Sequence, residues 1–274
     1  MKTHVPFRFH LFSQVFVPFQ SELTGIDFYR PTEIGPSLDG VGEIPALRWL
    51  ARRPDLMQLI LGQLGLRGRV CLDVEVTEPF LPRYNAGDID LLAVPERDPR
   101  LAIAFQAKRF KARLSDRGDN IHLDGAKLDK LIDQCNRTLQ LGFCQVYGLV
   151  LVMIDGHRNS AASILHHGTS DRTFRRLYQF TRSVSLDWRV GIVFAEIVQP
   201  TAASFNKLGL LSVGVDKMSH PVGQTGEFSS LVERWAEEMT MNGKASDVQL
   251  PPLQGKPLLV RPDETIGLQL VRRS

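Results

Sequence analysis

The sequence predicts an α/β fold in which a mixed β-sheet is flanked by helices. Short runs rich in Val, Ile and Leu have the length and composition of strands; they lie at 70–78, at two places within 87–111, at 145–154 and at 189–198. Apolar residues recur at helical spacing between 128 and 139, and a second helix is expected over 169–182. Strands and helices therefore alternate through the middle of the chain.

Three segments are expected: an irregular N-terminal arm (1–42), an α/β core (43–200) and a C-terminal extension (201–274). Prolines within 5–19 restrict any strand there to a sheet edge, and the glycines and prolines of 21–42 are typical of a loop. The core is expected to open with two short helices or one kinked helix, because Pro54 interrupts the helical pattern.

The segments after the Gln106 strand and after residue 200 carry weaker signals. The polar residues of 113–125 favour a loop. Ser230, followed three residues later by Glu233, is typical of a capping box that opens a helix. Four prolines after Gly243 favour an extended tail.

Composition indicates an ordinary globular chain of 274 residues, 43% of them hydrophobic, with a net charge of +3. This charge permits a polyanionic partner without requiring one. Three cysteines without CxxC spacing argue against disulfides and structural zinc. The longest apolar run, Val146 to Ile154, is too short to cross a bilayer, and the N-terminus lacks the pattern of a signal peptide. We therefore expect a cytoplasmic protein with no membrane partner.

One stretch, Gly87 to Lys111, carries unusual polar residues. It predicts two strands joined by a charged turn that contains two prolines. Side chains alternate along a strand, so Asp88 and Asp90 share one face, and Gln106 and Lys108 share another. Charges on otherwise apolar strands must pair with each other, with a metal or with a ligand, because burying an unpaired charge costs several kcal/mol.

The sequences GDIDLL and AFQAKRF in this stretch resemble the PD-(D/E)xK nuclease superfamily. The similarity is greatest to the Mrr-type restriction endonuclease branch, in which glutamine commonly replaces the acid of the motif. The resemblance extends over roughly 43–155, in the order helix, strand, strand, strand, helix, strand. It implies a restriction-endonuclease-like fold for the core.

The resemblance also implies a function: metal-dependent hydrolysis of DNA phosphodiester bonds by an endonuclease, in defence against foreign DNA or in repair. Mg²⁺ or Mn²⁺ would be held by Asp90, the Gln106 side chain and the Ala107 carbonyl, with Asp88 as an additional ligand. Lys108 would orient or deprotonate the attacking water. Glu43, at the head of the first helix, completes the catalytic set, although an acid there is also common for its interaction with the helix dipole alone.

The basic residues directly after the motif, Arg109, Lys111 and Arg113, are candidates to bind the nucleic-acid backbone. The chain lacks a GKS or GKT phosphate loop, a GxSxG elbow and a dinucleotide-type GxGxxG, which leaves the corresponding enzyme classes without support. The alternative is a nuclease-fold module without turnover that binds nucleic acid or scaffolds a complex. Whether the substrate is DNA or RNA stays open, as do the formation of a homodimer and binding to partner proteins of a defence system.

Overall fold

The computed structural model describes eight segments of the chain: 11–18, 41–81, 87–115, 118–121, 125–155, 182–198, 208–243 and 246–250. All but the last residue of the helix predicted over 169–182 lies outside these segments, as does the tail after residue 250. Within the described part of the chain, no helix is long and apolar enough to span a bilayer.

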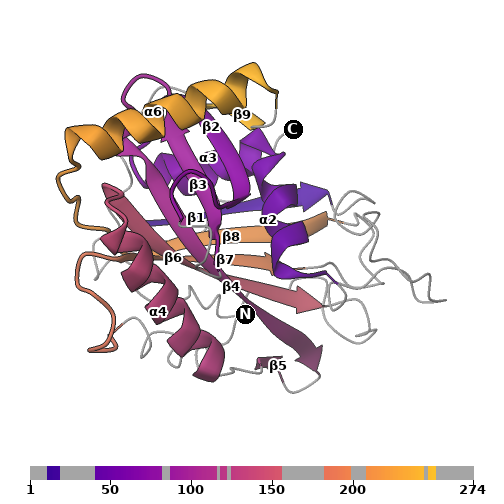
Figure 1. Cartoon of the computed structure of the whole chain (residues 1–274). Coiled ribbons are helices and arrows are strands. Elements are labelled where there is room, and N and C mark those ends of the chain that lie inside the picture. Colours follow the sequence, from indigo (N-terminus) through magenta and orange to yellow (C-terminus); the bar gives the residue numbers. More distant parts are fainter. Residues whose placement is uncertain are drawn as a thin grey trace.

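The nine strands of the described segments form one mixed sheet (Figure 1). Their order is β1-β8-β7-β6-β4-β3-β2-β9, and β5 is attached to β4. The β4–β6 and β6–β7 pairs are parallel, and the other pairs are antiparallel. The strands are β1 (Leu11–Pro18), β2 (Gly68–Val76), β3 (Ile89–Pro95), β4 (Ile103–Ser115), β5 (Gly118–Ile121), β6 (Gln145–Asp155), β7 (Gly191–Val198), β8 (Leu208–Lys217) and β9 (Ser246–Leu250).

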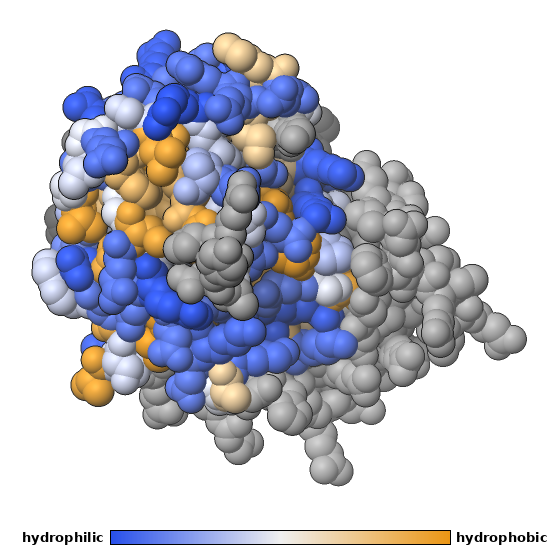
Figure 2. Space-filling view, in the orientation of Figure 1, coloured by the Kyte–Doolittle hydropathy of each residue, from blue (hydrophilic) through white to orange (hydrophobic). Residues whose placement is uncertain are grey.

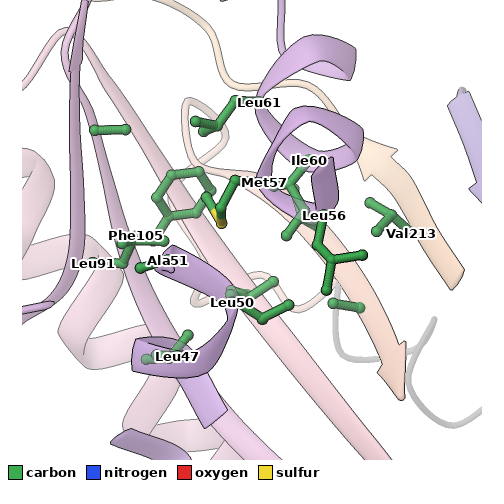
Figure 3. Packing of buried hydrophobic residues seen from close by; sticks show 14 of the residues in the cluster. Leu47, Leu50, Ala51, Leu56, Met57, Ile60, Leu61, Leu91, Phe105 and Val213 are labelled. Atoms are coloured by element: carbon green, nitrogen blue, oxygen red, sulfur yellow. The ribbon is translucent and has the colours of Figure 1, made fainter. Parts of the chain in front are cut away.

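Two short helices, α2 (Glu43–Ala51) and α3 (Pro54–Gln63), cover one face of the sheet. Pro54 occupies the first turn of α3, where a missing N–H costs nothing. Of the two predicted alternatives, the structure has two short helices and not one kinked helix. Helix α3 contacts both β8 and β9, which are far apart in the strand order, so the sheet curls around these helices. Figure 3 shows the apolar side chains of α2 and α3 packed against Leu91, Phe105 and Val213 of the sheet.

Helices α4 (Gly125–Gln140) and α6 (Gly226–Met241) cover the opposite face. The predicted apolar stripe of α4 is confirmed, because Leu131, Ile132, Cys135 and Leu139 are buried. The outer surfaces of both helices are mostly hydrophilic, and apolar residues gather between them (Figure 2). The α/β class with a mixed sheet between helical layers is therefore confirmed.

The structure departs from the sequence predictions near the C-terminus and after the motif. Helix α6 begins at Gly226, where the Thr225 hydroxyl accepts a hydrogen bond from Phe228 N at 3.2 Å; the prediction that Ser230 caps it is wrong. Strands β8 and β9 lie in a region where one helix and a tail were predicted. A short hairpin formed by β4 and β5 occupies part of the predicted 113–125 loop.

Candidate active site

Strands β3 and β4 separate at the centre of the sheet. Their pairing includes Leu91 with Phe105, Leu92 with Ala104 and Ala93 with Ile103, and β5 pairs with β4 only from Ala112 onward. Among the described strands, residues 106–111 of β4 therefore have no partner on the edge between β3 and β5, although β6 is paired along the other edge. We call this opening the β4 gap. Backbone groups that face it need partners of another kind.

Two carboxylates supply acceptors in the β4 gap. Asp90, at the start of β3, accepts a hydrogen bond from the Ala107 backbone N–H at 2.6 Å. Glu43, the first residue of α2, accepts one from the Arg109 backbone N–H at 2.7 Å. The two side chains thus satisfy N–H groups that a paired strand would otherwise satisfy, and both carboxylates are brought to the same stretch of β4.

Two lysines supply donors in the same gap. The Lys108 ammonium donates to the Ala107 carbonyl, lies 3.2 Å from Glu43 Oε1 and lies 3.8 Å from Asp90 Oδ2. Lys127, in the first turn of α4, donates to the Arg109 carbonyl at 3.4 Å. Lys108 is 7% exposed, whereas Lys127 lies at the surface. Anionic and cationic side chains consequently alternate along this edge.

Burial, assisted by the neighbouring charges of Glu43 and Asp88, raises the pKa of Asp90 to about 7. The Ala107 N–H and the Lys108 ammonium act in the opposite direction without overcoming the loss of hydration. Near neutral pH this carboxyl group is therefore divided between its neutral and charged forms. A perturbed carboxyl group beside a buried lysine is typical of functional sites, and structural ion pairs also produce it.

Gln106 lies beneath α4 and is 2% exposed. Its Nε2 is 2.9 Å from the Asp88 carbonyl and 3.0 Å from Thr138 Oγ1, while its Oε1 is buried and no described residue hydrogen-bonds it. Asp88 contributes to this arrangement through its backbone carbonyl, and its side chain is half-buried. Asp90, Gln106, Lys108 and Glu43, which the sequence singled out, are thus brought together in one region.

The predicted basic residues have different surroundings. Arg109 is 8% exposed, and its Nε lies 3.1 Å from Met153 Sδ, which disfavours contact with a nucleic-acid backbone. Lys111 is exposed, and the side chain of Arg113 lies outside the described residues. Sequence reasoning missed Lys127 and Thr138. A threonine on the apolar face of α4 was a signal for the second, but no local pattern pointed to the first.

The oxygen atoms around the β4 gap are of the kinds that bind hard divalent cations. Asp90 and Glu43 offer carboxylates, Ala107 offers a carbonyl, and Gln106 Oε1 is a buried acceptor without a hydrogen-bond partner among the described residues. Mg²⁺ and Mn²⁺ favour oxygen ligands of these kinds. In the described segments, no group of three or more His, Cys, Asp or Glu side chains is placed to hold a metal ion. A cation here would therefore depend on amide and carbonyl oxygens beside two carboxylates.

Comparisons with known proteins give no assignment, since no protein-family model, curated protein or solved structure matches the chain. The fold and the site define the chain as an α/β protein with a polar, partly buried site where two central strands separate.

Proposed function

We propose that this protein is a divalent-metal-dependent nuclease with a restriction-endonuclease-like core, and that its substrate is DNA. One observation supports this most directly: the Lys108 ammonium lies among oxygen atoms of Asp90, Glu43 and Ala107 where β3 and β4 separate. Three oxygen atoms from three elements converge on one cationic group. Such a place can hold a metal ion when the ammonium moves aside.

The proposed ligands are Asp90, the Ala107 carbonyl and the Gln106 side-chain oxygen, with Glu43 as a fourth oxygen donor. A bound Mg²⁺ or Mn²⁺ would polarise the phosphodiester and lower the pKa of a coordinated water. Because Gln106 is neutral, Asp90 and Glu43 provide the negative charge of the ligand set. Ionisation of Asp90, whose pKa lies near 7, is therefore required for tight binding.

The proposal requires the Lys108 side chain to take a second conformation when a metal ion is bound. Its ammonium lies 3.2 Å from Glu43 Oε1 and 3.8 Å from Asp90 Oδ2, and repulsion from a divalent ion would turn its flexible side chain away from them. There it would orient the attacking water and stabilise the negative charge that develops on the phosphate oxygens. Lys127 and Lys111, both exposed near the β4 gap, would contact phosphates of the substrate.

A second candidate function is nucleic-acid binding without turnover. It is favoured by the pairing within the β4 gap: Lys108 is paired with both carboxylates, and each carboxylate accepts a backbone N–H of β4. The same contacts would be found if these side chains only satisfied the open edge of β4 and took no part in catalysis. Gln106 in place of an acid also reduces the negative charge available to a metal ion.

Cleavage assays can distinguish the two functions. Purified protein is incubated with supercoiled plasmid, linear duplex, single-stranded DNA and RNA, with Mg²⁺, Mn²⁺ or EDTA. Asp90→Asn and Lys108→Met are assayed beside the wild type, since both approximate the shape of the original side chain. Surface variant Lys130→Met is the matched control, because Lys130 is an exposed lysine of α4. Melting curves establish that each variant is folded.

The proposal expects metal-dependent cleavage by the wild type and Lys130→Met, and a loss of about 100-fold or more in the two site variants with binding retained. Cleavage that persists in both Asp90→Asn and Lys108→Met contradicts the proposed site. Salt-sensitive binding with no cleavage of any substrate supports the second function.

A further inference from the structure

The side-chain amide of Gln106 makes an unequal set of contacts. Its nitrogen has two hydrogen-bond acceptors, the Asp88 carbonyl at 2.9 Å and Thr138 Oγ1 at 3.0 Å. Its oxygen is buried and has no hydrogen-bond partner in the part of the chain that the structure describes. Leaving a buried carbonyl oxygen unpaired is unfavourable, so such an atom suggests a group that binds there.

The two contacts at the nitrogen end determine which way the amide points. A backbone carbonyl such as that of Asp88 can only accept a hydrogen bond. Thr138 donates its single hydroxyl hydrogen to the Gln134 carbonyl at 2.9 Å, so toward Gln106 it can only accept. A rotated amide would place its oxygen against two acceptors and leave both N–H groups without these partners. The NH₂ group must therefore face Asp88 and Thr138, and the oxygen must face away.

This orientation matters because only the oxygen of the glutamine amide can bind a cation, whereas its NH₂ group cannot. A carboxylate can present either of its two oxygens to a cation, whereas a glutamine that rotates about its last bond presents N–H groups, which repel it. Replacing an acid by Gln106 therefore creates a requirement that an acid would not have. The hydroxyl of Thr138 meets this requirement from the neighbouring helix.

We propose that Thr138 is a positioning residue that, together with the Asp88 carbonyl, holds Gln106 Oε1 ready as a neutral ligand for a divalent cation. This inference rests on the proposed function, because it assigns the cation to the same site. It adds a residue of α4 to the groups that arrange the proposed metal ligands, which otherwise come from α2, β3 and β4. Thr138 itself does not touch the cation.

Mn²⁺ binding to the full chain tests the ligand role. Free Mn²⁺ is followed by electron paramagnetic resonance, without nucleic acid, for the wild type, Thr138→Val and Thr138→Ser. The matched control is Asn136→Ala, which removes two hydrogen bonds between the same helix and the 182–190 turn, those to the Ser185 carbonyl and the Asp187 N–H. We expect Thr138→Val to weaken Mn²⁺ binding by about 10-fold, the effect typical of residues that orient metal ligands. Thr138→Ser and Asn136→Ala should bind as the wild type does. Equal affinity in Thr138→Val and the wild type would overturn the inference, and so would an equal loss in Asn136→Ala.

Hydrogen exchange of the Gln106 side-chain NH₂ gives a readout that needs no metal. Its NMR signals are assigned by their loss in Gln106→Glu, and exchange is measured in EDTA. Slow exchange in the wild type and Thr138→Ser, with faster exchange in Thr138→Val, supports the orienting contact. Unchanged exchange in Thr138→Val overturns it, even if the wild type binds Mn²⁺. If the wild type binds no Mn²⁺, the proposed function and the ligand role both fail, and a changed exchange rate then assigns Thr138 a structural role.

Discussion

The Lys108 ammonium lies 3.2 Å from Glu43 Oε1, although the two residues are 65 positions apart in the sequence. The other oxygen of the same carboxylate accepts the Arg109 backbone N–H at 2.7 Å. The first residue of α2 is thus joined to two consecutive residues of β4. This relationship connects helix α2 to the open edge of β4, and it links the stability of the fold to the geometry of the site.

Replacing Glu43 by alanine should destabilise the protein by about 1–3 kcal/mol, because a partly buried N–H of Arg109 loses its partner. The matched control is Glu227→Ala, which removes an exposed acid from the first turn of α6. Interaction with the helix dipole alone is worth about 0.3–1 kcal/mol. Urea unfolding of both variants measures the difference. Equal losses would mean that Glu43 acts through the helix dipole and not through β4.

Stability should depend on pH through Asp90. Its pKa is about 7 in the folded protein, against an ordinary value of 3.8, so between these values the folded state holds a proton that the unfolded state has lost. The stabilisation from this group is present below pH 4 and is lost as the pH rises through about 7. In the wild type we expect the free energy of unfolding to fall by an amount on the order of 1–3 kcal/mol between about pH 5 and pH 7, and Asp90→Asn should abolish this fall. Urea unfolding in EDTA across this range measures it.

Asp187 provides a control of opposite sign. Its hydrogen bond with Arg189 lowers its pKa to about 2, so its contribution to stability is complete above the ordinary value of 3.8 and is lost only as the pH falls toward 2. Asp187→Asn should therefore shift stability by a constant amount between pH 5 and pH 7. If the wild type and Asp90→Asn show parallel pH profiles, Asp90 has an ordinary pKa in solution.

Lys127 should contribute to nucleic-acid affinity more than Lys130, which is also exposed and lies three residues further along α4. Lys127 donates a hydrogen bond to the Arg109 carbonyl and therefore lies at the β4 gap. We expect Lys127→Ala to weaken binding and to lower the slope of log K against log salt by about 0.7–0.9, the value for one phosphate contact. Fluorescence anisotropy with single-stranded and duplex DNA in EDTA measures both. A larger effect of Lys130→Ala would place the binding surface further from the β4 gap.

Gly191 should not tolerate a side chain. A Cβ at this position would overlap the ring of Tyr147 and lie 2.6 Å from the Ser219 backbone nitrogen, which donates to the Tyr147 hydroxyl at 3.1 Å. Because Tyr147 is fully buried and the Ser219 contact involves backbone, neither can move easily. Gly191→Ala should cost at least about 2 kcal/mol in urea unfolding. Gly223→Ala, which meets nothing within 4 Å, should cost little. Similar values for both would show that the start of β7 can shift.

Local patterns were sufficient for the centre of the fold. The apolar runs of β3, β4 and β6 and the helical stripe of α4 depend on residues close in sequence, so their type could be predicted. The same holds for Asp90, Gln106 and Lys108, which stand out because charged and polar groups interrupt apolar strands. Glu43 was included through the resemblance, and its role as an acceptor for β4 could not be seen.

Strands β8 and β9 were missed because their stability comes from distant partners. β9 pairs with β2, and β8 pairs with β1 and β7. Their short apolar runs therefore form strands only when these distant partners are in place. Ser230 fits a capping box by spacing, but its hydroxyl bonds the Gly226 carbonyl inside α6. Several residues can satisfy a local capping pattern, and packing decides where the helix begins.

By itself the sequence determined the α/β class, the central strands and the polar residues on them, because side-chain alternation and helical periodicity are local properties of the chain. Tertiary structure alone decided that β3 and β4 separate, that Glu43 and Lys127 reach the opening from two helices, and that Thr138 orients Gln106. Those contacts depend on the pairing register and on how the helices pack across the sheet. These are set by the whole chain, because each backbone group left open by one strand must find its partner elsewhere.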